Sequence, residues 1–485
     1  MSGLSSPGIG SGLDVNSIVS QLVSLERRPI QILQSKASTL QTKLSGVGQL
    51  QGALAGLQDS AKNLATPTNY DAMSVSSSDS SSVTATVSSD PKPQVGSYAL
   101  GVTSLAAGQT LVSGSGQFTA ATQTVGAGTL TISLGQWLPG DIFSAKAGST
   151  PVDLTIGAGD SLTAIKDKIN AANAGVTASL VSDATGVRLS LQSTSTGAAN
   201  GFKLTTADSD GVNTDAAGLS RLAYDPQNAV TQMTRTVTGA DAVATVNGIE
   251  VKSATNVFDG VIEGLIFTAK KPTVTAATLT VGKNKETVRQ AVNSFVGAYN
   301  ALTKFLSEQT KYDPTTKQAG LFQGNGSVVG ILNQLKTQTI EPTGSSATFT
   351  TLSSMGSEVQ RDGSLQVSGA KLDNALNNLD EMKSAMTASS ALPAAVGLGR
   401  RFQRLADGLL AVNGGSVPSM SKSLQAQLAS NQKDQTRYEA RVATIEKRLR
   451  AEYSSLDTTV AKFNSLNSYV SQQVSAMSKW NNNGN

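Results

Sequence analysis

The chain has 485 residues, a net charge of +4, 4% aromatic residues, and neither cysteine nor histidine. Without thiolates or imidazoles it cannot form a disulfide, a Cys/His zinc site, or a nucleophile activated by histidine. The low aromatic content argues against a nucleic-acid stacking surface. Any catalysis would have to rest on carboxylates, Lys, Tyr or Ser, or on a hard metal bound by oxygen atoms.

The length and the placement of charge indicate a multidomain chain. At about 150 residues per domain, the length predicts about three domains. Residues 1–70 and 396–485 together carry a net charge of +8, and residues 71–395 carry −4. Bases alternate with acids in the end segments, as in Glu446-Lys447-Arg448-Leu449-Arg450. Such alternation is typical of a solvated helix face, so we expect no nucleic-acid partner.

Neither a secretory signal nor a membrane span is expected. The first eight residues lack the basic and apolar regions of a cleaved signal peptide. No run of about 18 uncharged apolar residues occurs, so we predict no membrane insertion. The protein is therefore expected to stay in the cytosol or to leave by a route that reads no cleaved signal.

The N-terminal segment carries two helical apolar stripes. The first begins after Asp14, a suitable N-cap, and Pro29 should break or kink the helix that follows. Residues of the first stripe are Val15, Ile18, Val19 and Leu22. The second stripe has steps of three and four, close to a heptad pattern. Its residues are Leu33, Ala37, Leu40, Leu44, Val47, Leu50, Leu54, Leu57, Ala61 and Leu64.

The C-terminal segment carries a longer stripe of the same kind. Apolar residues recur from Tyr438 to Met477 at about 3.5 residues per step, the period of a left-handed coiled coil. A helix with so narrow an apolar seam must bury it against another helix. The N-terminal stripe is the obvious partner within the chain. The predicted intrachain coiled coil consists of Leu40, Leu44, Leu54, Leu57, Val442, Ile445, Leu449 and Leu456.

Between the two ends the period changes to that of strands. Alternating residues predict strands at Val83–Val87, at Leu130–Leu134 and at Val187–Leu191. Asn247-Gly248 predicts a hairpin turn between two further strands. One helix, capped by Asp160-Ser161, interrupts the strands, and a helical pattern resumes after residue 284. The stripe of this later helix is Val288, Val292, Phe295, Tyr299, Leu302 and Leu306.

Three motifs invite a chemical interpretation and do not support one. The acidic segment from Asp208 to Asp215 has Ala217 where a calcium loop requires Glu, so a polar turn is expected instead. Ser368–Lys371 and Ser419–Lys422 fit the pattern S-x-x-K but lack the partner motif of Ser–Lys enzymes. Gly8–Gly12 is glycine-rich but follows no strand, unlike a phosphate loop. We therefore predict no enzyme, with no catalytic residue, no metal and no cofactor.

Several segments resemble the bacterial flagellar capping family, also called flagellar hook-associated protein 2. The N-terminal motif Gly8-Ile9-Gly10-Ser11-Gly12-Leu13-Asp14-Val15 and the segment from Gln21 to Pro29 are similar to the opening of that family. Residues 156–202 resemble the repeat shared with flagellins and hook proteins. The later matches are Val246-Asn247-Gly248, Phe295–Leu302, Phe463–Leu466 and Tyr469–Gln473.

The resemblance implies a structural cap at the distal tip of the flagellar filament. Members of such a family would form an oligomeric plate that retains exported flagellin and promotes its folding and insertion. The implied partners are further copies of the chain in a ring of about five, flagellin, the hook–filament junction proteins, and an export chaperone at the C-terminal helix. The implied location is extracellular, at the flagellar tip, after export through the flagellar type III apparatus.

The expected fold class is a multidomain α+β protein, with a leg of long coiled-coil-like helices from both chain ends and two mainly β head domains inserted between them. The expected segments are a terminal helix at 1–42, a helical leg domain at 43–78 with 283–425, a β head domain at 79–105 with 235–282, an inserted β-rich head domain at 106–234 that includes the flagellin/hook-like repeat at about 128–205, and a C-terminal coiled-coil helix at 426–485.

Both terminal seams are predicted to be poorly ordered until assembly, because they are too narrow to be satisfied within one chain. The residues expected at the filament or oligomer interface are Val15, Ile18, Leu22, Leu25, Phe463, Leu466, Val470, Val474 and Met477. Two alternatives stay open. One is a tip adhesin that binds mucin or host glycans through its head domains, for which residues 105–235 offer only Trp137 and Tyr224 as tryptophan or tyrosine side chains. The other is a different hook-associated or flagellin-like filament protein.

Overall fold

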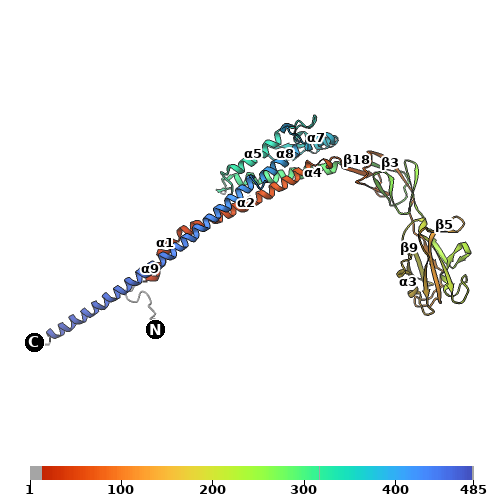
Figure 1. The fold of residues 1–485 in the computed structure, drawn as a ribbon, viewed down its shortest axis with the longest axis horizontal. Coiled ribbons are helices and arrows are strands. Elements are labelled where there is room, and N and C mark those ends of the chain that lie inside the picture. Colours follow the sequence, from red (N-terminus) through yellow and green to blue (C-terminus); the bar gives the residue numbers. More distant parts are fainter. Residues whose placement is uncertain (1–13, 316, 483–485) are drawn as a thin grey trace. The chain divides into compact units, whose positions relative to one another are not determined.

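The computed structural model describes residues 14–315 and 317–482, with side chains described up to residue 478. It divides into two compact units. Unit 1 combines Met1–Tyr70 with Lys285–Asn485, and unit 2 is Asp71–Asn284. The middle of the chain is thus inserted between two end segments that fold together, as the helical and strand periodicities predicted (Figure 1). The opening motif from Gly8 to Leu13 lies outside the described residues.

Unit 1 is built from helices and two short hairpins. The helices are α1 (Val15–Glu26), α2 (Arg28–Leu64), α4 (Lys285–Thr310), α5 (Gly326–Ile340), α6 (Gly369–Leu376), α7 (Leu379–Thr387), α8 (Leu398–Leu410) and α9 (Ser416–Asn482). The hairpins pair β19 (Tyr312–Asp313) with β20 (Gln318–Ala319), and β21 (Ser357–Val359) with β22 (Leu365–Val367). The first half of α2 lies along α9, and its second half also packs on α4 and α8 (Figure 1).

The ends of α1 and α2 follow the capping signals in the sequence. Asp14 caps α1, and its Oδ1 accepts a hydrogen bond of 3.0 Å from the backbone N–H of Ser17. The break between the two helices falls at Arg27, and Pro29 occupies the first turn of α2. A proline is tolerated there because the first backbone N–H groups of a helix have no intrahelical acceptor.

The core of unit 1 is formed by the predicted stripes. Leu50, Leu54 and Leu57 of α2 are fully buried, as is the stripe of α4. Phe402 of α8 completes an aromatic cluster, with ring centroids 5.0 Å from Phe295 and 6.1 Å from Tyr299. Aromatic pairs at these distances and near-perpendicular angles add to the free energy gained from burial.

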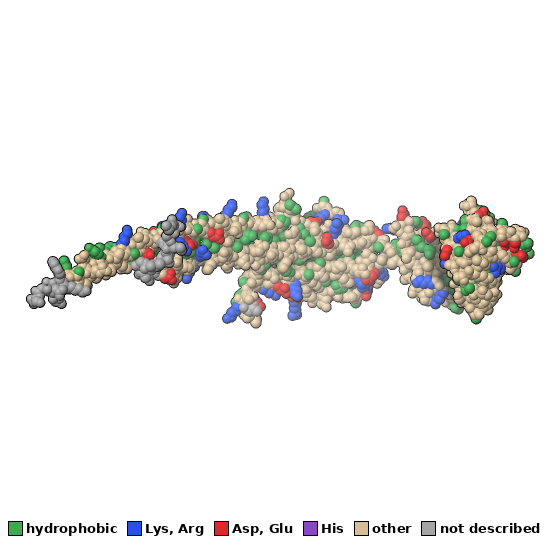
Figure 2. Space-filling view, turned by 90° about the horizontal axis from the view of Figure 1, so that it is seen from below, with side chains coloured by type: hydrophobic (Ala, Val, Ile, Leu, Met, Phe, Trp, Pro, Cys, Tyr) green, Lys and Arg blue, Asp and Glu red, His purple; other side chains and the backbone are tan. Residues whose placement is uncertain are grey.

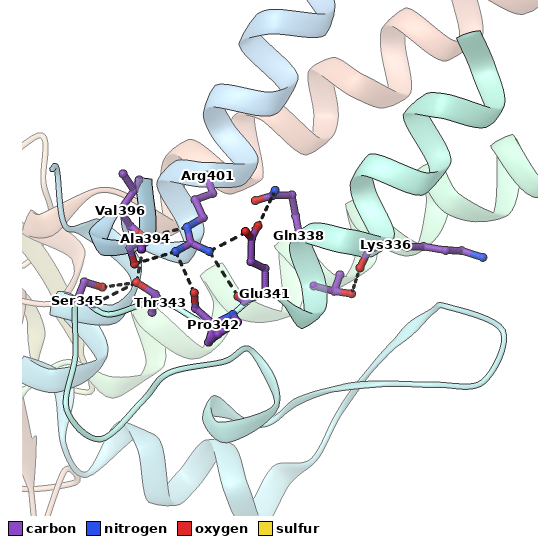
Figure 3. Close-up of polar contacts among 10 residues, drawn as sticks. Lys336, Gln338, Glu341, Pro342, Thr343, Ser345, Ala394, Val396 and Arg401 are labelled. Atoms are coloured by element: carbon purple, nitrogen blue, oxygen red, sulfur yellow. Dashed lines mark hydrogen bonds and ion pairs between the residues drawn. The ribbon is translucent and has the colours of Figure 1, made fainter. Parts of the chain in front are cut away.

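One arginine holds the loop segments beside α8 together. Arg401 donates hydrogen bonds to the backbone carbonyl groups of Pro342, Ala394 and Val396, each at 3.0 Å (Figure 3). Its guanidinium also lies 3.9 Å from a carboxylate oxygen of Glu341. These carbonyls come from segments about 50 residues apart in sequence. The planar guanidinium of Arg401 therefore connects both segments to α8.

Unit 2 is built from antiparallel sheets. One sheet has the order β1 (Met73–Ser77), β18 (Ala277–Lys283), β3 (Gly96–Ser104), β14 (Ala242–Val246), β15 (Ile249–Ser253), and a second has the order β16 (Val257–Ile262), β17 (Leu265–Ala269), β2 (Val83–Val87). These two sheets enclose one apolar core, which includes the stacked rings of Phe258 and Phe267. The predicted hairpin turn is confirmed, since Asn247 and Gly248 connect β14 to β15 with φ angles of 49° and 86°.

The remaining strands of unit 2 enclose a second apolar core. One sheet has the order β12 (Val230–Thr231), β11 (Tyr224–Asp225), β10 (Gly201–Asp208), β5 (Gly128–Leu138), β6 (Ile142–Ala145), with β7 (Val152–Ile156) also paired to β5. The other has the order β13 (Met233–Val237), β4 (Thr110–Ser113), β9 (Gly186–Ser193), β8 (Val176–Asp183). The predicted strands at residues 130–134 and 187–191 lie inside β5 and β9.

The single long helix of unit 2, α3 (Leu162–Ala171), packs on β8. Ser161 caps it, accepting a hydrogen bond of 3.2 Å from the backbone of Ala164, as predicted. Near its end, the side-chain amide of Asn170 bonds both the N–H and the carbonyl of Ala178, at 2.7 and 2.9 Å. The side chain thereby satisfies backbone groups on an outer strand of the sheet.

Phe402→Ala should destabilise unit 1 by about 3–5 kcal/mol, because it removes a fully buried ring and leaves a cavity between α4 and α8. Urea unfolding followed by circular dichroism at 222 nm measures the change. Val412→Ala is the matched control, since Val412 is exposed. A change below about 1 kcal/mol for Phe402→Ala would contradict the central role of this cluster.

Burial raises the pKa of Tyr299 from its ordinary value near 10 to about 12, and it also raises the pKa of Tyr70. The neutral forms are therefore favoured in the folded state. Their contribution to stability is complete below pH 10 and is lost as the pH rises toward 12. We expect the urea midpoint of unit 1 to fall across this interval, and to fall less in Tyr299→Phe. An equal fall in both proteins would show that Tyr299 does not cause it.

Candidate functional site

The two chain ends meet in a small apolar core where α1 and the start of α2 lie against α9. Its buried residues are Val15, Val19, Val23, Ile30 and Val442, with Tyr438, Leu449 and Tyr453 partly buried beside them. α2 runs antiparallel to α9, because Leu40 shares a core with Leu424 while Ile30 shares the next one with Val442. Arg450 adds a polar tie, since it donates to the side-chain oxygen of Asn16 at 3.2 Å.

The outward face of α1 carries three of the predicted interface residues. Ile18 is half-buried, Leu22 is 37% exposed and Leu25 is 53% exposed. Val15, which the sequence pattern grouped with them, is instead buried against α9 at 4% exposure. The difference arises because the inner face of α1 follows steps of four from Val15, so the residues between those steps point outward.

The residues predicted for one intrachain coiled coil are divided between two apolar cores: Leu40, Leu44, Leu54 and Leu57 lie in or against the large core of unit 1, and Val442 and Leu449 lie in or against the small core of α1 and α9. Leu40, Leu54, Leu57 and Val442 are buried, and Leu44, Ile445 and Leu449 are half-buried. Leu456 is 47% exposed and belongs to no apolar core. The described part of α1 begins close to Tyr453 in this pairing, so no described helix covers α9 beyond that point (Figure 1).

Beyond Tyr453, α9 presents a row of exposed apolar side chains, which we call the distal seam. The distal seam consists of Phe463, Leu466, Val470, Val474 and Met477, which are 66%, 57%, 49%, 60% and 71% exposed. Apolar side chains are visible along this end of the helix in Figure 2. Soluble proteins seldom expose a contiguous apolar row, so the distal seam is a candidate binding surface.

The electrostatics of the distal seam are weak. From Leu456 to residue 478 the charged residues are Asp457 and Lys462 alone, and the polar positions are Ser, Thr, Asn and Gln. Nearer the α1 pairing, by contrast, charged pairs occur, such as Arg450 with Glu446 at 2.9 Å. The distal seam can therefore bind an apolar helix face with little selection by charge, and it carries no group suited to catalysis.

The acidic segment that invited a chemical interpretation has a structural role. Asp208 accepts a hydrogen bond of 2.9 Å from the backbone of Ser220, and Asn213 accepts one of 2.7 Å from the backbone of Asp208. This arrangement confirms the predicted polar turn. Among the described residues, no group of acidic side chains is arranged to hold a metal ion. Lys371 and Lys422 are exposed rather than desolvated, unlike the Lys of a Ser–Lys nucleophile.

The aromatic residues that an adhesin would use are packed inside unit 2. Tyr224 is buried, and its ring lies 5.7 Å from that of Trp137. Trp137 also packs on Phe143 at 4.8 Å and donates from Nε1 to the carbonyl of Phe202 at 3.2 Å. These contacts fix the rings as part of the core and do not favour the mucin or glycan alternative.

Sequence reasoning missed several residues of the α1–α9 core. Val23, Ile30, Tyr438 and Tyr453 were not among the predicted site residues, although all contribute to that core. A signal was present, since Val15, Val19 and Val23 recur at steps of four.

None of the helices in the described part of the chain combines the length and apolar character that crossing a membrane requires.

Val23→Asp should release α1 from α9, because it buries an unpaired carboxylate in the small core that joins them. Leu22→Asp is the matched control, since Leu22 lies on the outward face of the same helix turn. Hydrogen exchange of residues 15–26 should accelerate in the first variant and stay near the original rate in the second. Equal acceleration in both variants would show that the inner face is assigned wrongly.

Comparisons with known proteins agree with this architecture. Profiles described as Flagellar hook-associated protein 2 N-terminus and C-terminus match residues 11–109 and 239–465, and a profile described as Flagellin hook IN motif matches residues 142–195. The A-type flagellar hook-associated protein 2 of Pseudomonas aeruginosa is 28% identical over 97% of each chain. The flagellar hook-associated protein 2 of Escherichia coli K12 is 27% identical over 98% of each chain.

A solved structure shows the same fold over most of the chain. The crystal structure of the D1-D2-D3 domains of the flagellar cap protein FliD from Escherichia coli is similar with a TM-score of 0.53 and 25% identity. The match covers 78% of this chain and 99% of that one. The combination of inserted β-rich segments, paired terminal helices and matches along nearly the whole length leads to one conclusion: the chain belongs to the flagellar hook-associated protein 2 family, a family of structural flagellar cap proteins found at the flagellar tip and not of enzymes.

Proposed function

We propose that copies of this chain assemble into a plate at the distal tip of the filament, where they retain exported flagellin and promote its folding and insertion. The observation that carries the proposal is the distal seam, an apolar row at the free end of α9 that the described chain leaves uncovered. A helix of this kind is stable in water only when a second helix covers its seam. In a filament cap, that second helix belongs to the structure being capped.

The chemistry of the distal seam fits partners with similar helices. Its apolar side chains recur at steps of three and four, and few charges flank them. Such a surface accepts any helix with a complementary apolar stripe, so flagellin, the hook–filament junction proteins and further copies of this chain are the proposed partners. Modest selectivity suits a cap that has to release one subunit and bind the next.

The remaining parts of the proposal concern export and organisation. The chain leaves the cell through the flagellar type III apparatus, and an export chaperone covers its C-terminal helix beforehand. About five copies form the ring. Within each copy, the terminal helices and the helical leg divide near residues 42 and 425, and the two β head domains divide near residues 105 and 235. The separate apolar cores of unit 2 support this last division.

Val470→Asp combined with Val474→Asp places two carboxylates in the distal seam and should abolish helix docking. The expected result is loss of motility, with flagellin spilled as monomer into the medium. Swimming assays and immunoblots of the medium measure both effects.

The matched control is Ser471→Asp combined with Ser475→Asp, which adds the same charge to exposed polar positions of the same two turns. The control should leave motility close to that of the original strain. If the valine variant still caps filaments and supports swimming, the distal seam is not the docking surface.

A further inference from the structure

Two amide side chains interrupt the seam that α9 presents to α2. The seam positions from Val417 to Tyr453 are apolar except for Asn431 and Gln435, which are 4% and 8% exposed. The Nε2 of Gln435 donates to the Oδ1 of Asn431 at 2.6 Å. The Nδ2 of Asn431 is enclosed and has no hydrogen-bond partner within the described part of the chain. An enclosed N–H without an acceptor weakens the pairing of the two helices, whereas an apolar side chain would strengthen it. We call this pair the polar layer.

The facing stretch of α2 is also poor in apolar contacts. From Gln31 to Thr39 its side chains are exposed, including Ile32 at 69%, apart from Leu33 and Ala37, which are half-buried. Neither of these two residues belongs to an apolar core. The gap on α2 and the polar layer on α9 therefore lie at the same level of the helix pair.

This gap divides the helix pair into two cores of unequal size. On one side is the large core of unit 1, whose members nearest the gap are Leu40, Leu424 and Leu428. On the other side is the small core of α1 and α9, whose members nearest the gap are Ile30 and Tyr438. We call the segments on the small side, residues 15–39 and 435–478, the arm, and the rest of unit 1 the body.

Packing beside the polar layer is incomplete as well. A groove of about 370 Å³ opens between the helices on the arm side. It is lined by Arg27, Ile30, Gln31, Gln34, Glu439, Val442, Ala443 and Glu446. The break between α1 and α2 at Arg27 lies at this groove, so the helical backbone is interrupted there too. Separating the arm helices would therefore break few contacts that the body depends on.

We propose that the polar layer is the point at which this helix pair opens, so that the arm helices separate and close again while the body stays folded. Opening costs the contacts of the small core and the hydrogen bond from Arg450 to Asn16, because the layer isolates that core from the large one. Each opening frees the inner faces of α1 and α9, where Val19 and Val442 lie. The role of this opening in the cell rests on the proposed function. A cap that advances along a filament must detach its arm helices and dock them again.

Hydrogen exchange of the full chain, at a concentration where it is monomeric, tests the opening. In the unmodified chain, amides of residues 15–26 and 440–453 should exchange far faster than those of α4. Asn431→Leu with Gln435→Leu joins the two cores and should slow exchange of the arm by roughly ten- to hundredfold, with α4 unchanged.

Gln432→Leu with Thr436→Leu is the matched control, because these residues are the exposed neighbours one position along α9. It should leave arm exchange unchanged. Equal protection of the arm and α4 in the unmodified chain would overturn the proposal. So would arm exchange that the Asn431 and Gln435 substitutions do not slow.

The purpose of the opening is tested in cells. The variant with leucine at both positions should fold and reach the medium but yield shorter filaments than the matched control. Filaments of full length would show that capping does not use the opening. The proposed function fails separately, on the Val470 and Val474 substitutions, because that experiment leaves the polar layer intact.

Discussion

The antiparallel pairing of α2 with α9 is the contact on which the rest of unit 1 depends. It joins residues more than 350 positions apart, so the ends of the chain must meet before the large core can close. Once they meet, the second half of α2 packs against α4 and α8, which carry the aromatic cluster around Phe402. Unit 2 then forms an insertion whose strands pair only among themselves.

The same pairing explains why the proposed docking surface lies at the far end of α9. α9 has 67 residues, whereas α1 and α2 together have 49. α9 therefore extends beyond its described partner helices, and the part of its seam that lies past Tyr453 remains exposed. The surface follows from the mismatch in helix length combined with an apolar repeat that continues past Tyr453, and it requires no specialised residue. Such an origin agrees with a surface that would bind another helix reversibly and would catalyse no reaction.

Periodicity in the sequence predicted the long helices because their burial follows a single repeat. The stripe of α4 and that of α2 from Leu40 onward lie in the core as expected, whereas Leu33 and Ala37 do not. Asn247-Gly248 forms the predicted hairpin turn, with positive φ angles at both residues. The inner face of α1 was harder to assign, since Val15, Ile18, Val19 and Leu22 offer two overlapping stripes. Only the position of α9 in the folded chain decides which of the two stripes faces inward. The periodicity of α1 alone does not contain that information. The exposure of Leu456 depends in the same way on where the partner helix ends, and the enclosure of Asn431 depends on how α2 lies along α9.

The side-chain amide of Asn170 has a further consequence under the proposed function, in which the chain refolds after export. By bonding both backbone groups of Ala178, it occupies hydrogen-bonding positions on β8, the outermost strand of its sheet. An open edge is the usual template for cross-β association between crowded, newly emerging chains. In the proposed cap, about five copies would emerge in succession into a small volume. Asn170, near the end of α3, would then cover part of a strand edge at the stage when the chains are most prone to associate.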